Sequence, residues 1–170
     1  WYDIDFIHES FDEIRISTKA TLDIVQESRI LNLYVFLFTK EGDRIYSRYF
    51  DKDDRMTSAG AVTGSDSNCW NAFTSETGKT TGTVRIKAPA ASDAILYIIA
   101  NIDEDMMNIS SDLLNTVTDV SSLDDLEVNL MQSTTSRTGY FPMVARLDGV
   151  NVNTTSIEAG TAYLDRLDAK

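Results

Sequence analysis

The segment Ile30–Phe38, Ile-Leu-Asn-Leu-Tyr-Val-Phe-Leu-Phe, decides the fold. Eight of its nine side chains are apolar, with Asn32 as the exception, and aromatic and β-branched residues dominate. Such a run is typical of a strand buried on both faces, and nine residues are few for a buried helix. Turn residues follow at 39–43, and Arg44–Phe50 has strand character again. We therefore predict a central β-hairpin whose five-residue loop places Gly42 at positive φ.

Further elements are predicted on both sides of the hairpin. Ile95–Ala100 is also apolar on both faces, and we expect it to lie beside Ile30–Phe38. The spacing of Leu123, Leu126 and Leu130 predicts a helix over Ser121–Met131, with Ser121 or Ser122 as its N-cap. The remaining predicted strands are Phe11–Lys19, Thr83–Ala88, Tyr140–Leu147, Val150–Ile157 and Thr161–Lys170. Together they predict a mainly-β sandwich of about seven or eight strands with one short helix in a crossover.

Two segments lack a clear period. Residues 1–10 mix aromatic and acidic side chains, and we interpret them as an N-terminal tail. Residues 51–83 are rich in Ser, Thr, Gly and Asn, and we interpret most of them as a long loop. Trp70 and Phe73 are among the few large apolar residues of this loop. Their rings could stack on a sugar, with Trp70 as the candidate glycan contact, or they could anchor the loop to the sandwich.

Composition and charge exclude several classes of function. The formal net charge of −12 disfavours binding to nucleic acid or to anionic membrane surfaces. Residues 88–136 contain no Lys or Arg, which indicates a solvated acidic surface, with cation binding as the alternative. No apolar run approaches the roughly 18 residues of a membrane span, and no signal peptide is visible. Cys69 is the only cysteine, so an intrachain disulfide is impossible and the cysteine count favours neither an oxidising nor a reducing compartment.

The motifs of common enzyme and metal sites are incomplete. His8 is the only histidine, which leaves little for a Ser-His-Asp triad or a histidine-based zinc site. Gly78-Lys79-Thr80 resembles the end of a phosphate-binding loop, but Phe73 stands where that loop needs a glycine. The acidic clusters at 51–54 and 103–105 lack the downstream Gly and Glu of an EF-hand. We therefore predict no catalytic residue, cofactor or metal site, and a glycosidase with carboxylates paired only in space stays open.

Four segments, in order along nearly the whole chain, carry a resemblance to a known family. They are Ile30–Phe38 with the following Gly42, Leu96–Asn101, Phe141-Pro142-Met143, and Leu164–Lys170. Together they resemble the N-terminal domain of the fimbrillins, the pilin-like lipoproteins that Bacteroidales assemble into surface fimbriae (type V pili). The family's second domain and its lipid-bearing cysteine are not part of this sequence.

The resemblance implies a transthyretin-like sandwich whose first strand is exchanged between subunits. In the family, proteolysis after export removes this strand in many members, and a strand from another subunit fills the groove. Here the exchangeable strand would be Phe11–Lys19, with Phe11, Ile14 and Ile16 as its apolar residues. The candidate cleavage sites are Arg29 and Arg15, and the simpler interpretation of both is an ordinary surface charge. Residues 11–170 would form one domain, whose last strand leads towards a second domain outside this sequence.

The resulting hypothesis is a non-enzymatic structural subunit of a cell-surface fimbria with a role in adhesion. Its partners would be other pilin subunits and surface ligands of host or bacterial cells, with no nucleic acid. Contact with the outer membrane would be made only through an N-terminal lipid anchor outside this sequence. The alternative is a cell-surface carbohydrate-binding module, or a lipoprotein that does not polymerise.

Overall fold

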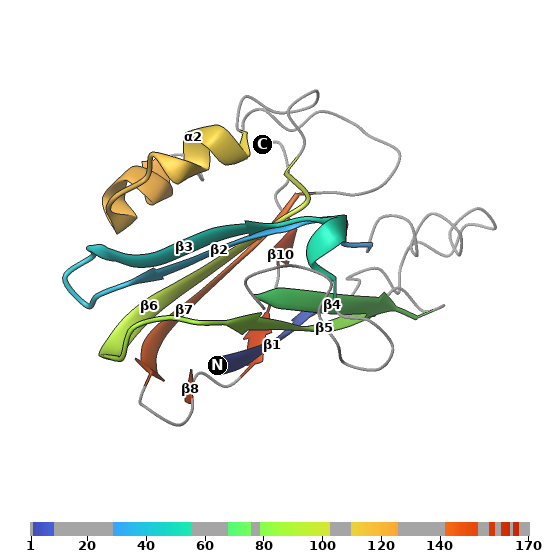
Figure 1. The fold of residues 1–170 in the computed structure, drawn as a ribbon, viewed down its shortest axis with the longest axis horizontal. Coiled ribbons are helices and arrows are strands. Elements are labelled where there is room, and N and C mark those ends of the chain that lie inside the picture. The colour runs from blue at the N-terminus through green and yellow to red at the C-terminus, as the bar shows by residue number, and fades with distance from the viewer. Residues whose placement is uncertain are drawn as a thin grey trace.

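The computed structural model describes residues 2–8, 29–55, 68–75, 79–102, 110–125, 142–152, 157–158, 161–163 and 165–166. These residues form three layers: a layer of short helices, a larger sheet and a smaller sheet (Figure 1). The larger sheet lies in the middle, so that each of its faces packs against another layer. The predicted mainly-β fold of two packed sheets is confirmed.

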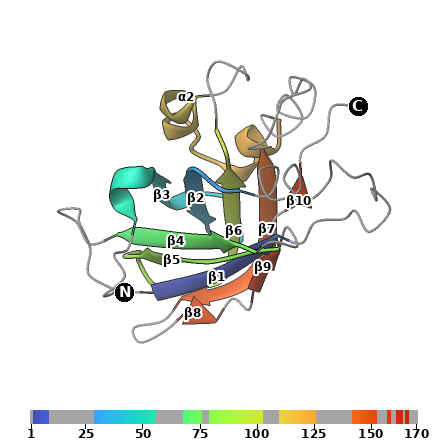
Figure 2. The ribbon, with the colours of Figure 1, turned by 90° about the vertical axis from the view of Figure 1, so that its right-hand side faces the viewer.

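The strands of both sheets are antiparallel apart from one short parallel pair. In spatial order, the larger sheet contains β10 (Asp165–Arg166), β7 (Met143–Val152), β6 (Ala91–Ala100), β2 (Leu33–Phe38) and β3 (Arg44–Phe50), while β8 (Ile157–Glu158) pairs with β7. The smaller sheet contains β4 (Cys69–Thr74), β5 (Thr80–Ile86), β1 (Tyr2–His8) and β9 (Thr161–Tyr163), in this order (Figure 2).

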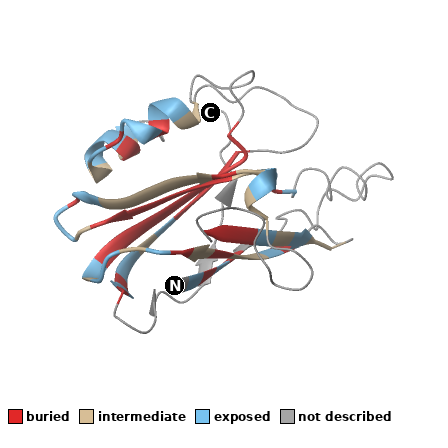
Figure 3. Ribbon diagram, in the orientation of Figure 1, coloured by how far each residue is buried: buried red, intermediate tan, exposed pale blue. Residues whose placement is uncertain are grey.

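The three layers explain why β2 is apolar on both faces. Side chains alternate between the two faces of a strand. Leu33, Val35 and Leu37 accordingly belong to the core between the two sheets, whereas Tyr34, Phe36 and Phe38 belong to the core under the helices. All six are fully buried, as the red strand in Figure 3 shows. The predicted pairing of β2 with β6 is confirmed, with Leu33 opposite Ala100 and Phe38 opposite Ile95.

The predicted β-hairpin is confirmed, and so is the positive φ of the glycine in its loop. Leu33 pairs with Phe50 and Leu37 with Tyr46, and a bulge follows at Phe38. Gly42 adopts a φ of 96°, a conformation that only glycine adopts without strain. A Cβ at this position would also lie 2.8 Å from Cγ1 of Val120, so the glycine lets the helical layer approach the hairpin closely.

The helical layer consists of two short helices between β6 and β7. The first, α2 (Ser111–Asn115), was not predicted, and the Ser110 hydroxyl caps it by accepting from the Leu113 amide at 3.1 Å. The second occupies 120–125 in the described part of the chain. Its predicted N-cap, Ser121 or Ser122, is wrong: the Asp119 carboxylate accepts from the Ser122 amide at 2.8 Å, and this bond lowers the pKa of Asp119. Leu126 and Leu130 lie outside the described residues.

Two interpretations of irregular sequence were wrong. The segment interpreted as a tail contains β1, because Ile4 and Phe6 alternate with two exposed aspartates and fill the core between the sheets. The long loop interpreted at 51–83 contains a 3-10 helix, η1 (Lys52–Asp54), and the whole of β4, whose Trp70 is a core residue. The predicted strand Phe11–Lys19 lies outside the described residues.

Candidate functional site

The feature of the fold that offers a functional site is the position of β1 within the smaller sheet. It pairs along its whole length with β5, from Tyr2 opposite Ile86 to His8 opposite Thr80. On its other side it pairs with β9 in parallel, over Asp5 to Ile7 only. The next described strand along the sequence, β2, lies in the other sheet. A single cut between these two strands would therefore separate β1 covalently from every strand that follows it.

The inner face of β1 is built into the core. Ile4 and Phe6 are each 1% exposed and belong to the cluster that joins the two sheets. Phe6 lies opposite Gly82, and a Cβ at Gly82 would lie 2.5 Å from Cε2 of the Phe6 ring and closer still to Cζ. The ring thus occupies the space that a side chain on β5 would otherwise fill. Burying an aliphatic and an aromatic side chain in this way stabilises a fold by roughly 1.5–3 kcal/mol each.

The outer face of β1 carries polar side chains that pair with β5. The Arg85 guanidinium donates to both carboxylate oxygens of Asp3, from Nε at 2.7 Å and from Nη2 at 3.1 Å. The hydroxyl of Thr83 donates to Asp5 at 2.8 Å. Each pair consists of residues directly opposite one another in the ladder. Exposed ion pairs contribute at most about 1 kcal/mol, so these contacts fix register and direction more than stability.

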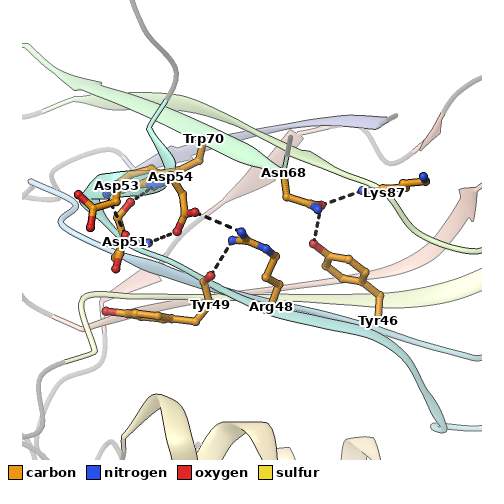
Figure 4. A network of polar contacts seen from close by, with 9 residues as sticks. All are labelled: Tyr46, Arg48, Tyr49, Asp51, Asp53, Asp54, Asn68, Trp70 and Lys87. Atoms are coloured by element: carbon orange, nitrogen blue, oxygen red, sulfur yellow. Dashed lines mark hydrogen bonds and ion pairs between the residues drawn. The ribbon is translucent and has the colours of Figure 1, made fainter. Parts of the chain in front are cut away.

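The side of the sandwich formed by β3 and β4 is closed by a polar network (Figure 4). The Arg48 guanidinium binds Asp54 at 3.1 Å, and the Asp54 carboxylate also accepts from the Asp51 amide at 3.0 Å. Nearby, the Asn68 side-chain oxygen accepts from the Tyr46 hydroxyl at 3.0 Å and from the Lys87 amide at 2.9 Å. The Arg48 contact joins β3 to η1, and the Asn68 contacts connect β3 to the segments beside β4 and β5, on the side away from β1 and β9. They also occupy carboxylates of the acidic cluster at 51–54.

Trp70, the candidate glycan contact, lies inside this closed side. Its side chain is 0% exposed, and its indole N–H donates to the Asp51 carbonyl at 2.8 Å. The Arg55 guanidinium covers the ring at 4.3 Å from its centroid, and burial lowers the pKa of this arginine. The anchoring alternative thus describes the position of Trp70, whose ring offers no exposed face to a sugar. Phe73, on the opposite face of β4, is 70% exposed.

A reciprocal pair of asparagines holds the start of β2. The Leu31 amide donates to the side-chain oxygen of Asn101 at 2.8 Å, and the Ile102 amide donates to that of Asn32 at 2.7 Å. The side-chain amide of Asn101 donates to the Arg29 carbonyl at 2.8 Å. We call these contacts between 29–32 and 101–102 the asparagine clasp. Asn101 is 2% exposed and adopts a φ of 62°, which asparagine tolerates better than most residues.

One of the two predicted cleavage sites lies within the asparagine clasp. The Arg29 side chain is exposed, but its carbonyl is bonded within the clasp and the following Ile30 is 3% exposed. The Ile30 carbonyl in turn accepts from Arg55 at 2.8 Å. Arg15 lies outside the described residues, as do the predicted strand residues Phe11, Ile14 and Ile16. The structure thus does not describe the strand that the sequence predicted to be exchangeable, and the first strand that it does describe is β1.

Cys69 provides a chemical probe for the smaller sheet. The thiol is fully buried opposite Arg85, and burial raises its pKa above the ordinary value. Because the thiolate is the reactive form, we expect iodoacetamide at pH 8 to modify the native protein far more slowly than the unfolded chain. Mass spectrometry of quenched samples measures the rate. Equal rates in native buffer and in denaturant would contradict the burial of this thiol.

Other site chemistry is not found in the part of the chain that the structure describes. No group of three His, Cys, Asp or Glu side chains among these residues is placed to hold a metal ion. No described helix has the length and the apolar character that crossing a membrane requires.

The fold is similar to that of a fimbrial assembly protein from Parabacteroides distasonis, determined by crystallography. The two structures superpose with a TM-score of 0.54 at 15% sequence identity, over 97% of this chain. The chain spans 53% of the length of that protein. No protein-family model matches the sequence, and no curated protein shows significant similarity to it. At this identity the likeness concerns the fold.

Proposed function

We propose that the chain is a non-enzymatic structural subunit of a cell-surface fimbria, and that β1 is the strand exchanged between subunits. The observation that carries the proposal is the position of β1: it is paired on both sides, fills the core between the sheets, and precedes every other described strand along the sequence. The fold shared with a fimbrial assembly protein supports it. The resemblance to the fimbrillins adds the expectation of export as a lipoprotein, adhesion and contact with other pilin subunits.

The physical reason for exchange is the edge that β1 would leave behind. Without β1, the backbone N–H and C=O groups of β5 that face it would lose their partners, and β9 would lose the described strand with which it pairs. The core would also open where Ile4 and Phe6 now pack. An extended segment from another subunit restores both the ladder and the core, which makes such an edge a strong binding site.

The two candidate cleavage sites differ in what cleavage requires. Cutting after Arg29 would need the asparagine clasp to open, because the carbonyl of this residue is bonded to Asn101 and Ile30 is buried. Cutting after Arg15 would leave the clasp in place. After either cut, the bonds from the Leu31 amide to Asn101 and from the Ile102 amide to Asn32 would still be available to hold the beginning of β2. We propose that the clasp marks the start of the permanent part of the subunit.

A truncation tests the exchange. We expect a chain that begins at residue 20 to unfold at lower denaturant concentration than the full chain, because its smaller sheet lacks β1. A synthetic peptide of residues 1–10 should bind the truncated chain and restore most of its stability. A peptide of residues 11–19, the strand predicted from sequence, is the matched control and should do neither. Urea unfolding followed by circular dichroism, with calorimetric titration of each peptide, measures both effects.

Two outcomes would contradict the proposal in different ways. If the truncated chain is as stable as the full chain and binds neither peptide, strand exchange is wrong. If the 11–19 peptide restores stability and the 1–10 peptide does not, exchange stands and the assignment of β1 is wrong.

A further inference from the structure

We call the space that β1 fills between β5 and β9 the β1 slot. The contact between Phe6 and Gly82 gives this slot a shape that favours one type of side chain. Gly82 lies opposite Phe6 on β5, and the ring occupies the space above its Cα. The backbone carbonyl of Asn71 on β4 approaches the same glycine, 2.5 Å from where its Cβ would stand. A flat ring fills this space, while an aliphatic side chain leaves part of it empty. Cross-strand pairing of an aromatic residue with a glycine also fixes the register.

The charge of the slot adds a second requirement, a carboxylate on the bound strand at a fixed number of residues from the aromatic ring. Arg85 lies opposite Asp3 and holds its carboxylate with two hydrogen bonds of 2.7 and 3.1 Å. This side-on geometry is specific for a carboxylate. Between the two requirements, Ile4 lies opposite Val84 and is buried in the core. On β5, the residue opposite Asp5 offers a neutral threonine hydroxyl in place of a guanidinium, so the position of Asp5 is the less demanding one.

We propose that the β1 slot selects its strand by a sequence rule: an acidic residue opposite Arg85, an aliphatic residue next to it, and an aromatic residue two positions further on, opposite Gly82. The inference rests on the proposed exchange and specifies its partner. The occupant is an extended segment of another subunit that carries this pattern and runs in the direction of β1. A strand shifted by one residue would place its apolar side chains on the outer face, and would fail on all three positions.

The binding of peptides to variants of the full chain, in which the peptide must displace the resident β1, tests the rule. Phe6→Ala in the full chain weakens the resident strand, and Phe6→Leu is the milder version should the first variant fold poorly. The probe is a fluorescein-labelled peptide of residues 1–10, and its affinity is measured by anisotropy. We expect the native peptide to bind about tenfold more tightly than its Phe6→Leu version. The Asp3→Asn version should lose about two- to fivefold in affinity, and the matched Asp5→Asn version less than that.

A charge exchange provides the control for Arg85. In the Phe6→Ala background, Arg85→Glu should weaken the native peptide and strengthen a peptide with Asp3→Lys, because the opposed charges are then restored. Since the Arg85 side chain is 36% exposed, this change should leave folding intact. Preference for the same peptide in both receptors would overturn the role of Arg85.

The outcomes separate the selection rule from the exchange itself. If all peptides bind a folded receptor with equal affinity, the rule is wrong while exchange stands. If no peptide binds any folded receptor, although circular dichroism shows native structure, the rule is wrong, and the truncated chain that lacks β1 decides whether exchange stands. Tighter binding of the Phe6→Leu peptide than of the native one would overturn the aromatic requirement alone.

Discussion

Trp70→Ala is expected to lower the free energy of unfolding by about 3–5 kcal/mol. The substitution removes a fully buried indole ring from the core between the sheets and leaves a cavity there. It also leaves the Asp51 carbonyl without its indole donor, and Arg55 without the ring that it covers. These partners cap the two ends of η1, so we expect the closed side of the sandwich to loosen. Urea unfolding measured by circular dichroism gives the free energy.

Phe73→Ala is the matched control for this prediction. Phe73 lies on the same strand as Trp70, three positions further on, but its side chain is 70% exposed on the outer face. Its loss should change stability by no more than about 0.5 kcal/mol. Equal destabilisation by the two substitutions would contradict the assignment of faces in β4. The same pair separates anchoring from glycan binding, since a Trp70 variant that is fully stable and has lost glycan binding would restore the carbohydrate-binding alternative.

Asn101→Ala is expected to cost about 3 kcal/mol of stability, the second large effect. The substitution removes both side-chain bonds that Asn101 makes in the clasp, to the Arg29 carbonyl and from the Leu31 amide. A partner left without its bond in a buried place costs about 1–3 kcal/mol. Alanine must also adopt the φ of 62°, which adds about 1 kcal/mol of backbone strain. The free energy from urea unfolding is again the measurement.

Asn101→Gly separates the two contributions. Glycine adopts the positive φ without strain but makes neither side-chain bond, so this variant should be less destabilised than the alanine variant. If both variants are as stable as the native chain, the clasp does not hold the start of β2. If the two lose equal stability, backbone strain plays no part.

The elements predicted correctly from sequence are those whose burial is extreme. β2 and β6 are apolar on both faces because the larger sheet is covered on both sides, and such runs stand out from any surroundings. The hairpin loop was predicted because Gly42 carries a local requirement for positive φ. α2 has five residues, too few to show a helical period, and only its Ser110 cap gives a signal.

The candidate site was harder to predict because its signal is spread along the chain. In β1, Ile4 and Phe6 do alternate with Asp3 and Asp5, but this short pattern resembles a polar tail until β5 is placed beside it. Gly82 likewise interrupts a strand pattern in the sequence, and only the pairing with Phe6 shows what the glycine accommodates. The burial of Trp70 depends on η1 and Arg55, which contact it from outside β4.

The two sheets differ in how many of their faces are covered, and therefore in the free energy that local opening of each sheet requires. The larger sheet is buried on both faces, and the aromatic row from Tyr34 to Phe38 fixes the helical layer to it, with Tyr34 bonded to Asn115. The smaller sheet has one buried face and one that carries Asp3, Asp5 and Phe73 at the surface. Because local opening is expected where the cover is thinner, the proposed exchange would require β1 to leave in a subglobal opening that costs less than global unfolding. The larger sheet would then act as a template that preserves the subunit's shape between the loss of one strand and the arrival of the next.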